Sequence, residues 1–138
     1  MTTPSVADLL SLRDKVAVVT GASQGIGAGI ALRLAEAGAT TVVHYRSNEA
    51  GANAVVDEIR AANGEAIALG ARLEDELATK VFIDQINHKY KSIDVLVNNA
   101  GVFPNKSFLE MSLKDWNDMF SANVDTAFNC SKFTANTM

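Results

Sequence analysis

The pattern of apolar and polar positions predicts a chain in which buried strands alternate with amphipathic helices. Four short apolar runs, at residues 16–19, 41–43, 66–69 and 93–97, are typical of strands in a parallel sheet. After each run, apolar residues recur at intervals of three and four, which is typical of a helix that lies on a sheet. The residues expected to face the core from these helices are Ile26, Ile30, Leu34, Ala52, Val55, Val56, Ile59, Leu77, Val81, Phe82, Ile86, Tyr90, Trp116, Phe120, Val124, Ala127 and Phe128.

Capping residues place the ends of these helices. Ser47 or Asn48 is suited to begin the second helix, and Ser112 is suited to begin a long fourth helix that runs towards the last residue. Gly38 is suited to end the first helix, since glycine tolerates the left-handed backbone found there. The acidic stretch 74–76 is expected in the first turn of the third helix, where the helix dipole favours negative charge.

Four strands that alternate with four helices predict an α/β fold with a doubly wound parallel sheet. The expected strand order is 3-2-1-4, with ligand sites at the carboxyl ends of the strands. No repeat, linker or low-complexity tract divides the sequence, so we expect one domain over residues 1–138, with 1–11 as an N-terminal extension. That extension is expected to form a short helix or to lie against the sheet edge. The fold is expected to be truncated after the fourth strand and its helix, which would leave that strand as an exposed edge.

Composition argues against several classes of function. The net charge is −4 and the isoelectric point is near 5.1, so nucleic acid and anionic membrane are not expected partners. Cys130 is the only cysteine, best explained by packing within a helix, and the two histidines are far apart in sequence, so no metal site is expected. There is no apolar run of membrane-spanning length and no secretory signal at the N-terminus, and we therefore expect a cytoplasmic protein.

The segment from Thr20 to Gly27 carries the clearest sign of function. It joins the first strand to the first helix and has glycines at positions 21, 25 and 27. Glycine allows a sharp turn and a close approach of the backbone to a ligand, while the positive end of the helix favours an anion, most often a dinucleotide pyrophosphate. A plain turn is the alternative, but the flanking strand and helix favour the phosphate site.

Three motifs, taken together, resemble the short-chain dehydrogenases/reductases, which are NAD(P)-dependent oxidoreductases with a Rossmann-type fold. The motifs are Thr20-Gly21-Ala22-Ser23-Gln24-Gly25-Ile26-Gly27, Asn98-Asn99-Ala100-Gly101 and Asn123-Val124. The resemblance extends from about Leu12 to the last residue and covers only the N-terminal, cofactor-binding part of such an enzyme. The stretch from His44 to Ser47 is similar to reductases of 3-oxoacyl chains or sugars, which is an analogy only.

The resemblance implies a set of cofactor-binding residues: Thr20, Gly21, Ser23, Gln24, Gly25, Ile26, Gly27, Tyr45, Arg46, Ser47, Arg72, Leu73, Asn98, Asn99, Ala100 and Gly101. It also implies that Asn123 holds a water molecule in a proton relay and that the 112–138 helix packs in a homo-oligomer interface. The alternatives remain that Asn98 and Asn99 are turn residues at a strand end, and that Asn123 bonds a neighbouring backbone group.

We predict a preference for NADP(H) over NAD(H). An NAD enzyme of this fold usually ends its second strand with an acidic residue, and that place falls here on Tyr45. Arg46 follows and is able to bond a 2′-phosphate, while Ser23 could add a hydroxyl. Gln24 argues the other way, because NADP-using relatives often have a basic residue there. His44 is expected at the adenosine end of the site.

The sequence departs from the family pattern in two places. Relatives commonly have an aspartate after the third strand that accepts a hydrogen bond from adenine, whereas this chain has Arg72, which has no acceptor. The family also uses a tyrosine, a lysine four residues later and an earlier serine for catalysis. The only tyrosines here are Tyr45 and Tyr90, which are followed at that spacing by Glu49 and Asp94.

Two hypotheses follow. The first is the cofactor-binding part of an NADP(H)-dependent oxidoreductase that transfers a hydride between the nicotinamide and a small carbonyl or alcohol substrate. The second is a non-catalytic module, which is either a truncated gene product that binds cofactor or a fragment that binds a partner chain through the exposed strand edge.

Overall fold

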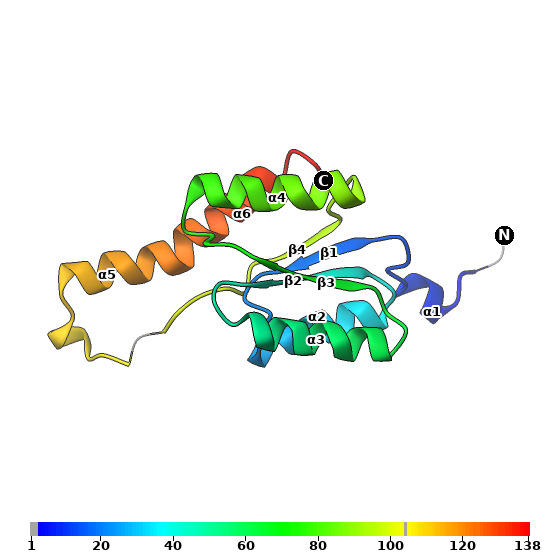
Figure 1. Ribbon diagram of the computed structural model, residues 1–138, viewed down its shortest axis with the longest axis horizontal. Helices are drawn as coiled ribbons and strands as arrows, with labels where there is room; N and C mark the ends of the chain where they lie inside the picture. Colours follow the sequence, from blue (N-terminus) through cyan, green and yellow to red (C-terminus); the bar gives the residue numbers. More distant parts are fainter. Residues whose placement is uncertain (1–2, 104) are drawn as a thin grey trace.

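The computed structural model describes residues 3–103 and 105–138 as a four-stranded parallel sheet with helices on both faces (Figure 1). The strands are β1 (Val16–Val19), β2 (Thr40–Tyr45), β3 (Ala66–Gly70) and β4 (Val95–Val97). They lie in the order β3-β2-β1-β4, so the predicted fold and strand order are confirmed. Because β1 is central, its carboxyl end lies between those of β2 and β4.

The helices form two layers (Figure 1). Helices α2 (Gly25–Glu36) and α3 (Glu49–Ala61) cover one face of the sheet, and α4 (Glu76–Tyr90) and α6 (Thr126–Thr134) cover the other. Helix α5 (Leu113–Phe120) projects beyond the sheet at the end where β4 finishes. The remaining elements are α1 (Val6–Leu9), the 3₁₀ turn η1 (Phe108–Glu110) and the π-helical turn η2 (Ser121–Asp125). The extension therefore contains the short helix that was one of its two expected forms.

Each face of the sheet has its own apolar core. Val19 and Val43 pack with the buried residues of α2 and α3, while Val18 and Val42 pack with Phe82 and its neighbours in α4. All four residues of β1 are buried, which explains why that strand is apolar at every position rather than at alternate positions.

Helix α2 packs on the sheet through small residues, and the predicted apolar row is wrong at its first position. The buried residues of α2 are Gly27, Ala31 and Ala35, whereas the side chain of Ile26 is 79% exposed. Small side chains let the helix axis approach the strands closely, so the larger residues lie beside the contact. Ile26 consequently lies on the surface next to the glycine loop.

Helix α4 is rotated relative to the face predicted for it. Phe82 and Ile86 are buried as expected, but Leu77 and Val81 are exposed. The expectation that Glu74 lies in the first turn is also wrong, because Asp75 is the N-cap and accepts a hydrogen bond from the N–H of Ala78.

The predicted long helix runs from Leu113 to Thr134 and contains a π-helical turn. Ser112 caps α5 as expected, through reciprocal hydrogen bonds with Asp115. The backbone stays helical through the π-helical turn η2, which joins α5 to α6, and α6 ends at Thr134. The apolar residues predicted to face the core here are largely exposed: Trp116, Phe120, Val124 and Phe128. Trp116, Phe120 and Phe128 were expected in the core or in an interface, and their exposure contradicts the core position only.

Candidate functional site

The loop between β1 and α2 turns on two glycines with left-handed backbone. Gly21 has a φ of +64° and Gly25 a φ of +59°, a region that favours glycine. A Cβ atom at Gly21 would lie 2.8 Å from the Cα atom of Ala100, whereas one at Gly25 would meet nothing within 4 Å. Gly21 is thus pressed against the second motif, and Gly25 faces open space.

The N-terminus of α2 lies directly behind this open side. Gln24 is the N-cap and makes no capping hydrogen bond with its side chain. Within the described residues, no side chain accepts a hydrogen bond from the first-turn N–H groups of this 12-residue helix. Uncapped N–H groups and the positive end of the helix dipole together favour an anion at this place.

The second motif holds the glycine loop in place. The Nδ2 atom of Asn99 donates to the carbonyl oxygens of Thr20 and Gly21, at 2.9 and 3.1 Å. In return, the buried hydroxyl of Thr20 accepts from the backbone N–H groups of Asn99 and Ala100, at 3.0 and 2.9 Å. The structure therefore joins two motifs that are about 80 residues apart in the sequence.

Asn98 and Asn123 lie further from the glycine loop. Asn98 is exposed and donates to the hydroxyl of Ser131 in α6 at 3.0 Å. Asn123 lies in the π-helical turn and donates through Nδ2 to the carbonyl oxygens of Met119 and Val102, at 2.8 and 3.0 Å. Asn123 therefore bonds neighbouring backbone groups and ties the helix to the segment after β4. Gly101 of the second motif packs directly against the side chain of Asn123.

His44 is buried beneath the glycine loop and does not line an open surface. Its Nδ1 atom accepts from the backbone N–H of Gly21 at 3.0 Å, and Nε2 lies 3.0 Å from the carbonyl oxygen of Ala71. Since the first partner only donates and the second only accepts, the ring is neutral with its proton on Nε2. Burial lowers the pKa of His44, although the bond to Ala71 and the charge of Glu74 oppose this effect. The sequence did not predict this bridging role.

The carboxyl ends of β2 and β3 carry a compact charged cluster. Nη2 of Arg46 forms an ion pair with Oε1 of Glu74 at 2.7 Å, and Arg72 donates hydrogen bonds to the same oxygen at 3.1 and 3.2 Å. Partial burial opposes ionisation of Glu74, but hydrogen bonds from its own backbone and from Arg72, with both positive charges, lower its pKa overall. These three residues line a groove that continues to Val102 and Met119. The part played by Glu74 was missed, although its position two residues after Arg72 was a usable signal.

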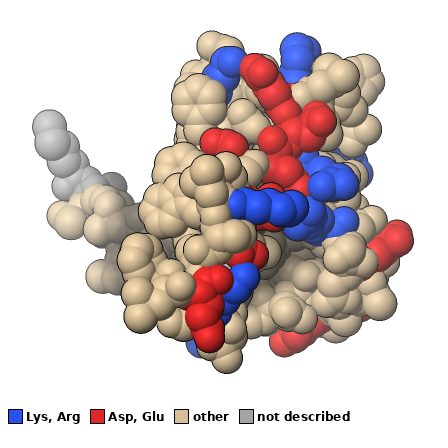
Figure 2. Space-filling model, turned by 90° about the vertical axis from the view of Figure 1, so that its left-hand side faces the viewer, with Lys and Arg blue, Asp and Glu red and all other residues tan. Residues whose placement is uncertain are grey.

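Figure 2 shows this edge of the molecule, seen from the end where α5 projects. Lys and Arg side chains gather near the middle of the face, directly beside Asp and Glu side chains. Positive and negative side chains are therefore mixed on this face, and the groove is lined by Arg46 and Arg72 together with the acidic residues Glu74, Asp115 and Asp118.

The other predicted site residues vary in accessibility. Ser47 is exposed beside Arg46, Ser23 is half-buried in the glycine loop, and Gln24 accepts a hydrogen bond from Asn48 at 3.4 Å. The ring of Tyr45 lies against Gly70 of β3. The side chain of Leu73 is buried in the core with 2% exposure, so it does not line the groove.

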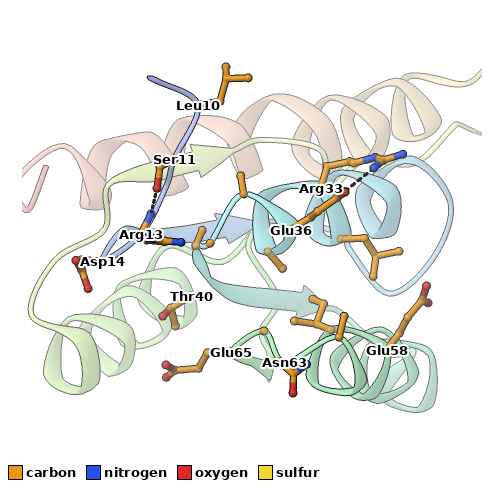
Figure 3. Close-up of a pocket in the computed structure, with 18 of the residues that line it drawn as sticks. Leu10, Ser11, Arg13, Asp14, Arg33, Glu36, Thr40, Glu58, Asn63 and Glu65 are labelled. Carbon is orange, nitrogen blue, oxygen red and sulfur yellow. Dashed lines mark hydrogen bonds and ion pairs between the residues drawn. The ribbon is translucent and has the colours of Figure 1, made fainter. Parts of the chain in front are cut away.

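A wider groove lies at the opposite end of the sheet (Figure 3). Charged side chains of both signs surround it, including Arg13, Arg33 and Glu36, the last two of which form an ion pair. The carboxyl ends of α2 and α3 border it, so the helix dipoles make it unfavourable for an anion. In open α/β sheets ligands bind outside the carboxyl ends of the strands, and the glycine loop is therefore the stronger candidate.

Metal and thiol chemistry have no support in residues 3–103 and 105–138. No group of three or more His, Cys, Asp or Glu residues is arranged there to hold a metal ion. Cys130 is fully buried in α6, and burial raises its pKa to about 12. Within the same residues, no helix has both the length and the apolar character needed to cross a membrane.

Comparison with known proteins agrees with the fold and the motifs. The family described as short chain dehydrogenase matches residues 15–138. The chain belongs to the short-chain dehydrogenase family. A 3-oxoacyl-(acyl-carrier-protein) reductase of Staphylococcus aureus is 40% identical over 116 residues, which cover 84% of this chain and 47% of the relative. The chain spans about half the length of the curated relatives that it matches.

Solved structures of the short-chain dehydrogenase family share the whole arrangement. A dehydrogenase/reductase from Sinorhizobium meliloti superposes with a TM-score of 0.92 at 33% identity, covering 96% of this chain and 52% of that one. A short chain dehydrogenase from Burkholderia cenocepacia, solved in complex with NADP, has a TM-score of 0.87 at 37% identity. The match covers 92% of this chain and 52% of that one.

Proposed function

We propose that this chain binds NADP(H) as the cofactor-binding part of an oxidoreductase acting on a carbonyl or alcohol. The observation that carries the proposal is the uncapped N-terminus of α2 behind the open side of Gly25. A pyrophosphate fits there because it accepts several backbone hydrogen bonds and is attracted by the helix dipole. The nicotinamide, when bound, supplies or takes up the hydride.

Each part of the site has a distinct task in this proposal. Backbone N–H groups from Ser23 to Gly27 bind the pyrophosphate, because those of Thr20, Gly21 and Ala22 already donate within the protein. Asn99 keeps that loop rigid through its two carbonyl contacts. The adenosine lies along the carboxyl ends of β2 and β3, near Tyr45 and Arg72. The segment from Asn98 to Gly101 forms the wall of the site at the end of β4.

The 2′-phosphate of NADP(H) is assigned to Arg46. No acidic residue ends β2 to bond the ribose hydroxyls of NAD(H), since Tyr45 occupies that position. Partial loss of hydration, together with the nearby Glu49 carboxylate, raises the pKa of Tyr45, so its hydroxyl stays neutral and does not repel a phosphate. The relative solved with NADP supports the same choice of cofactor.

These 138 residues do not contain the tyrosine and lysine pair that the family uses for proton transfer. Neither tyrosine is followed four residues later by a lysine. Asn123 is proposed to hold a water molecule through Oδ1, because its Nδ2 atom is engaged with two carbonyl groups. We therefore expect the 138-residue chain to bind cofactor weakly and to show no turnover by itself, which is also the behaviour of a non-catalytic module.

Titration of the purified chain with NADPH and with NADH, followed by cofactor fluorescence or calorimetry, tests the proposal. We expect tighter binding of NADPH, a loss of about tenfold or more in Gly25→Ala and a loss confined to NADPH in Arg46→Ala. Gly29→Ala and Arg33→Ala, which alter the same helix away from the loop, are the matched controls and should bind as the unaltered chain does. Equal affinities for the two cofactors would contradict the choice of NADP(H), and an unchanged Gly25→Ala variant would contradict the site.

Turnover is measured separately, as consumption of NADPH with a panel of ketones and 3-oxoacyl thioesters. No consumption is expected from this chain. Reproducible turnover that is lost in Asn123→Ala would show that the chemistry lies in these residues after all.

We also propose that the exposed apolar residues of α5, η2 and α6 pack against a second copy of the chain. Trp116, Phe120, Val124 and Phe128 recur every four residues, and the rings of Trp116 and Phe120 stack with centroids 6.4 Å apart. An exposed apolar stripe of this kind marks an interaction surface. Analytical ultracentrifugation should find a dimer or larger assembly that Phe120→Glu dissociates; a monomer at all concentrations would contradict this.

A further inference from the structure

Two arginines from neighbouring strands converge on a single carboxylate oxygen. Arg46 directly follows β2, and Arg72 lies two residues beyond β3. Nη2 of Arg46 forms an ion pair with Oε1 of Glu74 at 2.7 Å, while Nη2 and Nε of Arg72 donate hydrogen bonds to the same oxygen at 3.1 and 3.2 Å. The two positive groups are therefore held within hydrogen-bond reach of one oxygen atom.

The strand pairing explains why these residues meet. Strands β2 and β3 are parallel and in register through Tyr45 and Gly70, so the residues that follow them emerge side by side. Glu74 lies in the turn that leads from β3 into α4, and its side chain is only 20% exposed, against 50% and 68% for the arginines. The carboxylate thus occupies the inner position of the cluster and the guanidinium groups form its outer rim.

A carboxylate bound by two guanidinium groups occupies a place that also suits a phosphate. Both anions accept charge-assisted hydrogen bonds from arginine, and a phosphate monoester carries more charge and one more terminal oxygen than a carboxylate. The cluster lies where the proposed function puts the adenosine ribose, at the ends of β2 and β3.

We propose that Arg72 is a second ligand of the 2′-phosphate beside Arg46, and that Glu74 is an internal competitor that holds this anion position until the phosphate displaces it. The inference rests on the proposed function for the identity of the ligand. It assigns a role to the residue that stands where relatives commonly have an adenine-binding aspartate, and it makes Glu74 a determinant of cofactor affinity.

The charges of the cluster give the direction of the effects. Binding of the phosphate requires Glu74 to give up its contacts with both arginines, so the acidic side chain lowers affinity for NADP(H). Glu74→Gln keeps the size of the side chain but removes its negative charge, and we expect NADPH to bind about three- to tenfold more tightly. NADH lacks the 2′-phosphate, so its affinity should be almost unchanged.

Arg72→Ala should have the opposite effect. It removes one of two cationic ligands, and NADPH should bind about fivefold more weakly or worse while NADH is nearly unaffected. If Arg72 instead stacks on the adenine ring, its removal in Arg72→Ala should weaken binding of both cofactors equally, because the base is common to both. The difference between the two cofactors therefore separates a phosphate ligand from a stacking group.

The experiment is calorimetric titration of the purified chain and its variants with NADPH, NADH, 2′,5′-ADP and 5′-ADP. Glu76→Gln is the matched control for Glu74, since this exposed glutamate pairs with Lys132 outside the cluster. Thermal unfolding of each variant verifies that it is folded. The inference is supported if Glu74→Gln binds NADPH and 2′,5′-ADP more tightly and Arg72→Ala binds them more weakly. Binding of NADH and 5′-ADP should be unchanged in both variants.

Three results would overturn the inference. Equally weakened binding of all four ligands by Arg72→Ala would identify Arg72 as a stacking group. Weaker NADPH binding by Glu74→Gln would show that the carboxylate positions the arginines. Unchanged binding by both variants would show that the cluster is not part of the site. If the unaltered chain binds none of the ligands, the proposed function itself fails and this inference fails with it.

Discussion

The Nδ1 atom of His44 accepts a hydrogen bond from the backbone N–H of Gly21 at 3.0 Å. This contact ties the end of β2 to the glycine loop, and the opposite side of the ring is fixed by the carbonyl oxygen of Ala71. The ring of Phe82 packs edge-on against it from α4, with centroids 5.2 Å apart. A proton on Nδ1 would turn the acceptor into a donor that faces another donor, so the native site requires the neutral ring.

The first prediction is a loss of stability in mild acid that originates at His44. Its pKa is lowered from 6.5 in the folded chain, so the unfolded chain binds the proton first. The contribution of His44 to the free energy of unfolding is therefore complete above pH 6.5. It falls as the pH drops from 6.5 towards the lowered pKa of the folded chain, by at most about 1.4 kcal/mol per pH unit. Denaturant unfolding between pH 7.5 and 5 measures it. His44→Asn keeps an acceptor for Gly21 and does not titrate, so its profile should be flatter; an identical slope in both proteins would refute the assignment.

The second prediction separates two glycines of helix α2. A Cβ atom at Gly27 would lie 2.4 Å from Nδ2 of Asn99 and 2.5 Å from the carbonyl oxygen of Gly21, whereas one at Gly29 would meet nothing within 4 Å. Gly27→Ala should cost about 1–3 kcal/mol of unfolding free energy, because the loop and Asn99 must both shift. Gly29→Ala should be neutral or stabilise by up to about 1 kcal/mol through its better helix propensity. Chemical denaturation of both variants is the measurement, and equal effects would mean that Gly27 is not in close contact.

The third prediction concerns the donor role of Asn99. Asn99→Asp replaces the NH₂ group with an oxygen that faces the carbonyl groups of Thr20 and Gly21. Loss of two hydrogen bonds and repulsion between acceptors should cost about 2 kcal/mol or more. The adjacent Asn98→Asp is the control, since Asn98 is exposed and the hydroxyl of Ser131 is able to donate to a carboxylate. A larger loss of stability in Asn98→Asp than in Asn99→Asp would show that Asn98, rather than Asn99, holds the glycine loop in place.

Sequence reasoning was most successful where a pattern reports on the backbone. Short apolar runs predicted the strands, and their alternation with helices predicted the parallel sheet and the strand order. It was less successful for helix faces. Ile26 and Leu77 lie on apolar rows yet are exposed, because small residues in α2 and the rotation of α4 decide which side approaches the sheet.

The candidate site divides in the same way. Local motifs identified the glycine loop and the segment after β4, and the structure brings them into contact through Thr20 and Asn99. The contact of His44 with Gly21 depends instead on the pairing of β1 with β2, and those of His44 with Ala71 and of Glu74 with Arg46 depend on the pairing of β2 with β3, which no local motif encodes. The π-helical turn at Asn123 was also not predictable from the helical periodicity on either side of it.

The last prediction uses Cys130 as a reporter of how α6 docks. The thiol is buried, and a pKa of about 12 leaves on the order of one thiolate in ten thousand at pH 8, so the native chain should react with thiol reagents only when α6 opens. Nδ2 of Asn129, the neighbouring buried residue, donates to the carbonyl oxygen of Leu73 at 3.1 Å and holds the helix against the turn after β3. Asn129→Ala should leave that carbonyl without its donor and speed labelling by about tenfold or more.

Labelling with a chromogenic disulfide reagent at pH 8 measures the opening. A Cys130→Ala chain that carries Ser131→Cys has its thiol at an exposed neighbouring position and should react at the rate of a free peptide. Rapid labelling of the unaltered chain, at a rate similar to this control, would show that Cys130 is accessible. An Asn129→Ala variant that labels no faster would show instead that apolar packing alone, with Phe82 and Ile86 in the same core, holds α6 in place.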